Sequence, residues 1–484
     1  MKLLKLSLLG ILVSACAAKE TGSGDISRMP RQTPAQEVVE RITPMDIDSR
    51  KARQIFEKRA FENGLEVFAV QKASIPMVTI SITVRNGAFV ETEDLDGLAH
   101  FYEHMFFKAN ERYPSQRDFM QALNRLGVEL GPNMNAYTST ESVRYFFTLQ
   151  SHLLDQGLEF MSHALIRPSF QQEELERERE VILSELDMYD SDPSHSFFQN
   201  EVLKNLFSEH YTRKNIGGSR EVIRETTQEK MREIQNQYYV PNNSSIFVVG
   251  HFEPNELWAS VERHFGPRAW SQAPDPFTER PIPAHPPLED SIRAIKRDRV
   301  QTVTVTKAFH GPSFVENDRE TVVFDLLGRL LNRDSSRFQK ELVDSGLATT
   351  AGFSSWTQRH TSLLMFSLEA MPEKAQAAAS KFQSLIAQMS QGGFFNQNEL
   401  AVAKTGMEAS AAYDTEVGQR LALGLGNIWS STGSLDYYVN YIEMLRSIEL
   451  KDIDQALKKY IGDQHFVVAA LLPEEAKEIE LSLR

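Results

Sequence analysis

The chain has little cysteine, no long apolar run and a shortage of positive charge, and each shortage excludes a class of protein. Cys16 is the only cysteine among 484 residues, so an intramolecular disulfide is excluded. The apolar run at residues 6–13 is far shorter than the ~20 residues that a membrane-spanning helix needs. The formal net charge of −14 argues against a nucleic-acid partner. Hydrophobic residues make up 41% of the chain, which is enough for large cores.

The N-terminus resembles a bacterial lipoprotein signal peptide. A basic start and the short apolar run precede the segment Val13-Ser14-Ala15-Cys16. We therefore predict a signal peptide at residues 1–15 and a lipid attached to Cys16, which would tether a periplasmic protein to the membrane. Ala17 rather than aspartate follows the cysteine, and the resemblance to enteric lipoproteins then favours the outer membrane. The alternative is an ordinary secretory signal in which the cysteine has no role.

Composition predicts where the folded parts begin and end. Residues 16–52 are polar and contain several glycines and prolines, so we expect a flexible tether. Six prolines between residues 271 and 290 predict a linker. The folded halves are then expected at residues 53–270 and 291–484.

Hydrophobic periodicity predicts an α+β fold in which the second half repeats the first. An Asn63-Gly64 turn predicts a hairpin near residues 61–70. The pattern predicts further strands at residues 77–85, 133–138, 143–150 and 246–249, and helices at 98–108, 113–126, 153–166, 171–189 and 231–239. In the second half it predicts strands at 300–307 and 466–472 and helices at 318–331 and 453–460. We expect each half to be an antiparallel sheet packed with helices, the two enclosing a cavity.

The segment His100-Phe101-Tyr102-Glu103-His104 carries the clearest chemical signal. Two histidines four residues apart on a helix point the same way and can bind one zinc ion. The glutamate precedes the second histidine, which is the inverted order of the common zinc-protease motif. Alternatively, the helix is buried and its histidines only satisfy hydrogen bonds in the core.

A glutamate-rich helix at residues 171–189 supplies a candidate third ligand. Steps of four and three place on one face Glu174, Glu178, Val181, Glu185 and Met188. Such acidic runs are usually solvated. Glu185 follows an apolar turn, however, so we expect it to point inward, where a carboxylate needs a partner such as a metal ion.

These motifs together resemble the pitrilysin/insulysin superfamily of zinc peptidases, in particular the branch of the mitochondrial processing peptidase and its bacterial relatives. The resemblance covers about residues 55 to 480 and is carried by segments 97–105, 135–138, 176–185, 238–242 and 248–250. It implies that His100, His104 and Glu185 bind zinc and that Glu103 is the general base. It also implies that Glu178 supports a ligand imidazole and that an edge strand binds the peptide substrate through Asn135, Ala136 and Tyr137.

One part of the family pattern is missing. Active single-chain relatives carry an arginine and a tyrosine seven residues apart in the second half, and here Leu342 and Thr349 occupy those positions. The first half therefore looks catalytic and the second half does not. Arg337 and Lys340 lie nearby as candidate substitutes. The resemblance to two-chain bacterial relatives suggests a homologous subunit that supplies the Arg/Tyr pair in a heterodimer.

We interpret the chain as a zinc metalloendopeptidase that hydrolyses peptides or unfolded segments in a closed chamber. The main alternative is a catalytically weak or inactive binding or chaperone-like subunit of a peptidase heterodimer. A periplasmic solute-binding lipoprotein is a third possibility, which explains the signal peptide but not the metal ligands.

Overall fold

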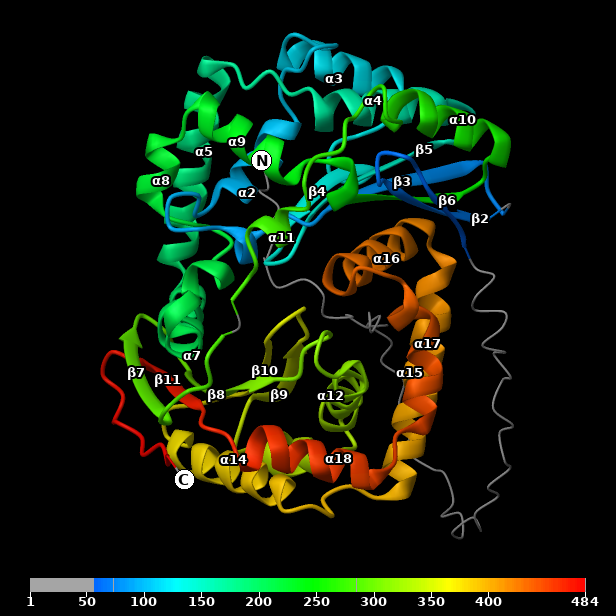
Figure 1. Ribbon diagram of the computed structural model, residues 1–484. Coiled ribbons are helices and arrows are strands. Elements are labelled where there is room, and N and C mark those ends of the chain that lie inside the picture. Colours follow the sequence, from blue (N-terminus) through cyan, green and yellow to red (C-terminus); the bar gives the residue numbers. More distant parts are fainter. Residues whose placement is uncertain (1–55, 73, 284, 484) are drawn as a thin grey trace, which may run out of the picture. The chain divides into compact units, whose positions relative to one another are not determined.

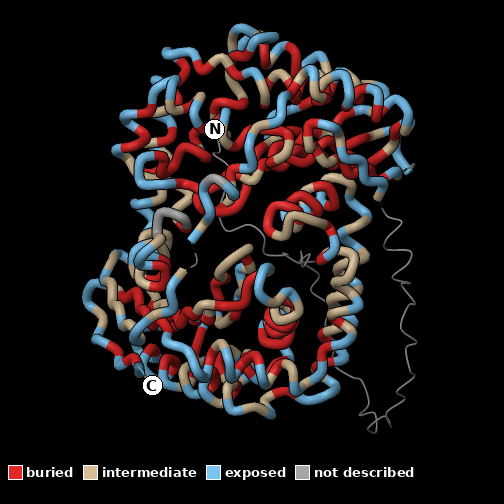
Figure 2. Tube along the Cα trace, viewed as in Figure 1, coloured by how far each residue is buried: buried red, intermediate tan, exposed pale blue. Residues whose placement is uncertain are grey.

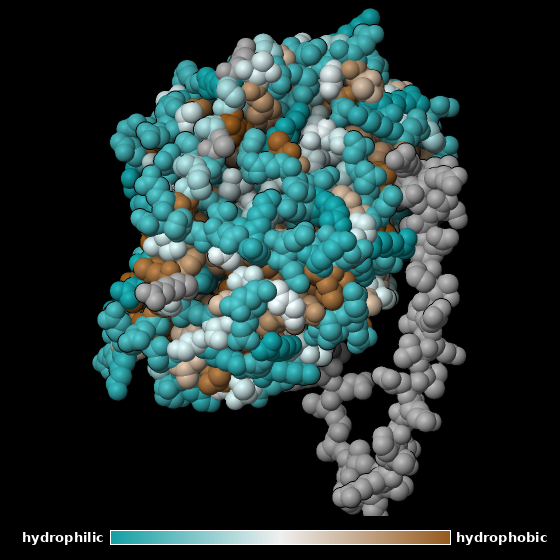
Figure 3. Space-filling model, turned by 60° about the horizontal axis from the view of Figure 1, so that its bottom comes forward, coloured by the Kyte–Doolittle hydropathy of each residue, from teal (hydrophilic) through white to brown (hydrophobic). Residues whose placement is uncertain are grey.

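The computed structural model describes residues 56–72, 74–283 and 285–483. The predicted signal peptide, the tether and the lipidation site Cys16 lie outside the described residues. The described residues belong to one compact unit. None of their helices combines the length and the apolar character that crossing a bilayer requires. Polar side chains predominate on the face drawn in Figure 3, with only scattered apolar spots.

Within the described residues, the first half contains a six-stranded sheet in the order β1-β2-β6-β3-β5-β4 (Figure 1). Its strands are β1 (Glu57–Ala60), β2 (Glu66–Gln71), β3 (Met77–Val84), β4 (Met134–Thr138), β5 (Val143–Gln150) and β6 (Ser244–Gly250). Gly64 has φ +84° in the predicted turn between β1 and β2. All neighbours are antiparallel except β2 and β6. Strand β4 is the last strand of this sheet; Leu130 bridges to Met134 at its start, and no described strand pairs with the outer side of its remaining residues up to Thr138. This position matters for the site.

Helices cover one face of this sheet and form the first core. They are α2 (Leu98–Phe106), α3 (Gln116–Arg125), α4 (Leu154–Ile166), α5 (Gln172–Ser191), α8 (Arg220–Glu225), α9 (Gln228–Tyr238), α10 (Pro254–Phe265) and α11 (Pro276–Glu279). Alternate residues of β5 (Val143, Tyr145 and Phe147) join Ile80 and Ile82 of β3 beneath them. Figure 2 shows this buried layer along the strands. Two short helices of the first half, α6 (Pro193–Phe197) and α7 (Lys204–Leu206), lie outside this core.

The second half repeats the sheet. Its strands are β7 (Ile292–Asp298), β8 (Val303–Gly311), β9 (Thr350–Trp356), β10 (Ser362–Ala370) and β11 (Val467–Pro473). Among the described residues their order is β7-β11-β8-β10-β9, which corresponds strand by strand to β2-β6-β3-β5-β4. The helices are α12 (Asp318–Leu331), α13 (Arg337–Gln339), α14 (Ala375–Ser390), α15 (Gln397–Glu416), α16 (Gly418–Thr432), α17 (Asp436–Ser447) and α18 (Leu450–Leu457). The predicted α+β fold with two similar halves is confirmed. Each sheet contains one parallel pair, β2–β6 or β7–β11, in addition to the expected antiparallel pairs.

Each half lends helices to the other sheet. Helix α16 of the second half packs on β3 and β6 of the first sheet, on the face opposite the first core (Figure 1). Leu421, Leu425 and Trp429 of α16 contact Phe68 and Phe247 there. In return, the segment from α6 to α7 packs on the second sheet against β8 and β11. The two halves are therefore interlocked. We call the face of the first sheet opposite the first core its open face, since α16 packs mainly on β3 and β6 there.

A buried polar junction also joins the halves beside β4. Glu141, in the turn between β4 and β5, accepts hydrogen bonds from the backbone N–H of Arg359 and the hydroxyl of Ser431. Gln358, in the turn between β9 and β10, donates to Thr140 at 2.6 Å. These bonds hold the hairpin that carries the edge strand β4 against the second half.

Candidate metal centre

Helix α2 displays the histidine motif on one side because its other side is buried. Leu98, Ala99, Phe101, Tyr102, Met105 and Phe106 are the buried residues of this helix, which leaves His100, Glu103 and His104 on the remaining face. Glu91 caps the N-terminus: its carboxylate accepts from the backbone N–H groups of Gly97 at 2.9 Å and Ala99 at 2.7 Å. The cap satisfies donors that a buried helix start would otherwise leave unpaired.

The ligand atoms predicted from the sequence converge. Nε2 of His104 lies 3.6 Å from Oε2 of Glu185, and Nε2 of His100 lies 3.9 Å from the same oxygen. One atom from each of the three side chains lies within 4.8 Å of the others. No other group of three His, Cys, Asp or Glu side chains in the described ranges converges in this way. Two imidazole nitrogens and a carboxylate oxygen form a donor set typical of catalytic zinc sites.

Helix α5 brings to α2 the glutamates that helical spacing placed on one face. Glu178 accepts a hydrogen bond from Nδ1 of His104 at 3.1 Å and pairs with Lys108 at 2.5 Å. Glu174 accepts from the backbone N–H of Ala109 at 3.1 Å. The bond at Nδ1 leaves Nε2 of His104 free to face Glu185, which is the arrangement that orients a ligand imidazole.

The electrostatics of the three side chains favour a cation between them. Burial lowers the pKa of His104, but its hydrogen bonds to Glu178 and Glu185 outweigh burial and raise it to about 9. The hydrogen bond from His104 lowers the pKa of Glu185 to about 2 against the opposing effect of burial. Burial and the neighbouring His104 lower the pKa of His100, whose buried Nδ1 has no hydrogen-bond partner among the described residues. A zinc ion fits these donors because its positive charge would replace that of the proton in the hydrogen bond between His104 and Glu185.

The candidate base Glu103 faces the edge strand. Its Oε2 accepts a hydrogen bond of 2.6 Å from the hydroxyl of Thr138, the last residue of β4. The charge of Glu103 also acts to raise the pKa of both His100 and His104, against the effect of burial. The structure therefore brings the metal ligands, Glu103 and the strand with Asn135, Ala136 and Tyr137 together.

Three supporting residues were missed in the sequence. Tyr189 donates to Oε1 of Glu185 at 2.8 Å. Lys108 and Tyr189 each follow a site residue by four positions on a helix or its end, so helical spacing could have identified them. Thr138 stands inside the segment that resembles the family, but only the tertiary contact reveals its role.

The positions of the missing Arg/Tyr pair have structural roles in the second half. Leu342 is fully buried in the second core. The hydroxyl of Thr349 donates to the backbone carbonyl of Glu369 at 3.0 Å. Arg337, a candidate substitute, pairs with Glu341 and donates to Gln388 within the same half. Lys340 is exposed.

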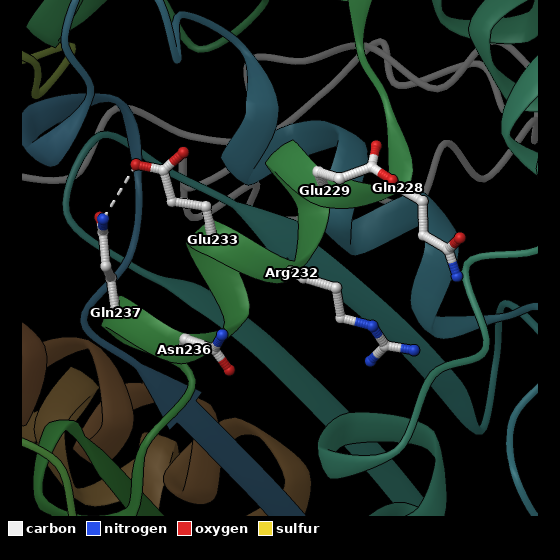
Figure 4. A pocket seen from close by; sticks show the side chains of 6 residues that line it. All are labelled: Gln228, Glu229, Arg232, Glu233, Asn236 and Gln237. Carbon is white, nitrogen blue, oxygen red and sulfur yellow. Dashed lines mark hydrogen bonds between the residues drawn. The ribbon is translucent and has the colours of Figure 1, made fainter.

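A separate hollow of about 510 Å³ lies along α9 and shares no residue with the metal centre. Its lining residues are Gln228, Glu229, Arg232, Glu233, Asn236 and Gln237. Figure 4 shows that these side chains spread along the helix instead of converging on one point. Arg232 donates to the backbone carbonyl of Pro168 at 2.8 Å. The hollow therefore presents no evident ligand site.

Two family models match the chain. The model described as Insulinase (Peptidase family M16) matches residues 66–221, and the model described as Peptidase M16 inactive domain matches residues 225–407. The chain belongs to the insulinase family, peptidase M16. All three converging ligand residues lie inside the first matched region of this M16 chain.

Known M16 proteins are similar to the chain at low identity. Zinc protease PqqE of Helicobacter pylori is 24% identical over 426 residues, which are 86% of this chain and 93% of that protein. The probable mitochondrial-processing peptidase subunit beta of Arabidopsis thaliana is 25% identical over 263 residues, which are 53% and 47% of the two chains. The chain matches only 48% and 54% of the lengths of two Bacillus subtilis zinc proteases, YmxG and YmfH.

Solved M16 structures share the fold. A protease from Helicobacter pylori superposes with a TM-score of 0.77 at 22% identity, covering 86% of this chain and 99% of that one. The periplasmic protease PqqL from Escherichia coli superposes with a TM-score of 0.71 at 18% identity, covering 87% and 48%. At these identities the likeness supports the fold alone.

The contact between Glu178 and His104 yields a prediction. Replacing Glu178 by alanine is expected to weaken zinc binding by about 10-fold to 100-fold, because His104 loses the acceptor that fixes its ring. Competition with a zinc-sensitive chelating dye would measure the affinity. Glu180→Ala is the matched control, since Glu180 is exposed on the same helix. Equal affinities in the two variants would contradict this role of Glu178.

Proposed function

We propose that the chain is a zinc-dependent metalloendopeptidase whose first half carries the catalytic residues. The observation that supports this most strongly is the convergence of His100, His104 and Glu185 beside Glu103. The relatives named zinc proteases support the same metal and reaction class.

The residues present suit the activation of water and the binding of the substrate in peptide hydrolysis. Zinc, when bound, would acidify a water molecule and polarise the scissile carbonyl. Glu103 would accept the proton of the attacking water and pass it to the leaving amine. The hydroxyl of Thr138 would keep the Glu103 carboxylate turned toward the water while β4 holds the substrate.

We propose that the substrate peptide adds to the free edge of β4. Extended peptides bind such edges through main-chain hydrogen bonds, as an additional strand. Strand β4 ends at Thr138, which touches the proposed base, so a peptide paired with β4 would pass beside the metal ligands. Asn135, Ala136 and Tyr137 would then pair with the substrate backbone or flank its side chains.

The absence of the Arg/Tyr pair leaves a second candidate function, a binding or chaperone-like subunit without turnover of its own. The buried Leu342 and the structural bond of Thr349 favour this candidate over a repaired active site within the chain. Turnover of unstructured peptides separates the two functions, because a binding subunit would retain peptides without cleaving them.

We further propose a heterodimer in which a homologous subunit supplies the Arg/Tyr pair. Loss of a donor that stabilises the oxyanion typically costs ~10²–10³ in rate, so the purified chain alone is expected to be slow. Adding the homologous partner should raise the peptide hydrolysis rate by about the same factor. The name of the similar mitochondrial-processing peptidase subunit beta shows that this relative is one subunit of a larger enzyme.

A fluorogenic unstructured peptide, assayed with and without each homologous chain encoded by the same organism, tests the heterodimer. Full activity of the isolated chain with no gain from any homologue would contradict it. Arg337 and Lys340 would then be the first residues to replace.

We propose that the protein is a periplasmic lipoprotein, divided into a tether at residues 16–52, halves at 53–270 and 291–484, and a linker at 271–290. The Val13-Ser14-Ala15-Cys16 segment supports the lipid anchor, and the similar PqqL is a periplasmic protease. Cys16→Ser is expected to release the protein from the membrane fraction or leave it unprocessed. Fractionation of cells and mass spectrometry of the N-terminus would show this, and a free thiol on a mature soluble protein would contradict the anchor.

A further inference from the structure

A buried arginine beside the proposed substrate edge has no counterion among the described residues. Arg144 lies on β5 with 8% of its surface exposed, and its buried Nε has no hydrogen-bond partner in the part of the chain that the structure describes. Among the described residues no carboxylate forms an ion pair with it; burial lowers the pKa of Arg144, and the phenol of Tyr137 opposes this effect. An uncompensated buried cation destabilises a protein, so a guanidinium in this state calls for an anionic partner.

The strand register directs this arginine toward the free edge. Arg144 pairs with Thr83 of β3 on one side and with Tyr137 of β4 on the other, so the three side chains form a row on the open face. The exposed fraction along the row rises from 0% at Thr83 through 8% at Arg144 to 43% at Tyr137. The hydroxyl oxygen of Thr83, and that of Ser81 in the neighbouring row, are also buried without hydrogen-bond partners within the described ranges. The row is thus polar, contains two buried atoms without hydrogen-bond partners among the described residues (Oγ1 of Thr83 and Nε of Arg144), and becomes more exposed toward the edge strand.

The cover over this row becomes thinner toward β4. Helix α16 packs closely on β3 and β6, and its Gly426 lies so near Thr83 that a Cβ there would come within 2.3 Å of the hydroxyl oxygen. The ring of Tyr137 stacks on Phe146, with 5.9 Å between centroids. Phe146 is the next residue of β5 on the same face, so the Tyr137 ring packs along the sheet toward Phe146.

We propose that Arg144 binds a carboxylate of the peptide that pairs with β4 and thereby determines substrate preference. This inference rests on the proposed function, in which the substrate adds to that edge. Alternate side chains of the added strand face the open side, about 10 Å from β5, since neighbouring strands lie about 4.8 Å apart. A long arginine and an acidic side chain extended toward each other span this distance, and guanidinium and carboxylate form strong paired hydrogen bonds.

The carboxylate has two possible sources, an aspartate or glutamate side chain and the C-terminus of a short peptide. The net charge of −14 would by itself favour basic peptides, which is the opposite of a preference for either carboxylate. A preference for a carboxylate would therefore report a local group such as Arg144 and not the overall field.

Peptide binding to the Glu103→Gln form, which holds substrate without cleaving it, tests the inference. Unstructured fluorescent peptides would be compared in pairs that differ by Glu against Gln at one position in turn, and in a further pair that ends in an acid or an amide. We expect one pair to show about 10-fold to 100-fold tighter binding of the carboxylate, by fluorescence anisotropy. Arg144→Gln in the same form should reduce that ratio to less than about twofold by removing this contact.

Arg117→Gln is the matched control, because Arg117 is exposed on α3 and its loss changes the net charge equally. It should leave the preference intact. The peptide pairs are first compared on the Glu103→Gln protein that retains Arg144, so this part of the test does not depend on whether Arg144→Gln folds. If peptides bind and are cleaved without any carboxylate preference, or if Arg144→Gln keeps the preference, the inference is overturned while the proposed function stands. If the zinc-loaded chain neither binds nor cleaves peptides, both are overturned.

Discussion

Replacing Glu103 by glutamine is expected to reduce peptide hydrolysis by at least about 100-fold while the zinc content stays near one ion per chain. Glutamine fills the same space and can still accept the hydrogen bond from Thr138, but it cannot take a proton from water. The substitution therefore removes the proton transfer and leaves the three converging ligands intact. Initial rates on a fluorogenic peptide and metal analysis of the same sample measure both quantities.

Glu93→Gln is the matched control for this experiment, because Glu93 is exposed outside the motif and its loss changes the charge equally. The control should keep the rate of the original chain. If Glu103→Gln cleaved peptides as fast as the control, Glu103 would not be the base. If it lost the metal as well as the activity, the glutamate would have to be counted among the ligands.

Replacing His100 by alanine is expected to have the other large effect, the loss of bound zinc together with activity. Two donors, His104 and Glu185, would remain of the three that converge within 4.8 Å. Catalytic zinc sites use three protein ligands, so the remaining pair should hold the metal far more weakly. Elemental analysis after dialysis should fall from about one zinc ion per chain to near zero.

His152→Ala serves as the control, since His152 is exposed and distant from the motif in sequence. It should retain zinc and activity. The thermal midpoint provides a further readout: zinc that binds only the folded chain stabilises it, so added zinc should raise the midpoint of the control but not of His100→Ala. Retention of stoichiometric zinc by His100→Ala would show that the metal lies elsewhere.

Much of the fold follows from local pattern. Alternating apolar residues placed β3 and β5 almost to the residue, and the helical pattern located α12 at residues 318–331. Strand β7 was missed because its residues are only partly buried and highly charged, and it is stabilised by parallel pairing with β11. That partner lies far away in sequence. Strand β8 was placed too early because Val300 precedes it; the strand begins at Val303.

The candidate site divides in the same way. The spacing of His100 and His104 on a helix is local, so the sequence alone indicated a metal pair. The pairing of that helix with Glu185 needed the family resemblance, because no local rule determines how two helices pack. The contact between Thr138 and Glu103 could not be predicted for the same reason, because it depends on where β4 lies relative to α2. The lack of an ion-pair partner for Arg144 among the described residues depends on the tertiary packing around it, which the local sequence does not determine.

Hydrolysis of an unstructured peptide in ¹⁸O-labelled water, followed by mass spectrometry, tests the central claim most directly. The zinc-loaded chain, combined with its homologous partner, is expected to yield two fragments whose new carboxylate carries the label. The same mixture made with Glu103→Gln should leave the peptide intact. Intact peptide in both mixtures, with zinc bound and peptide retained by the protein, would contradict the claim and identify the chain as a binding subunit.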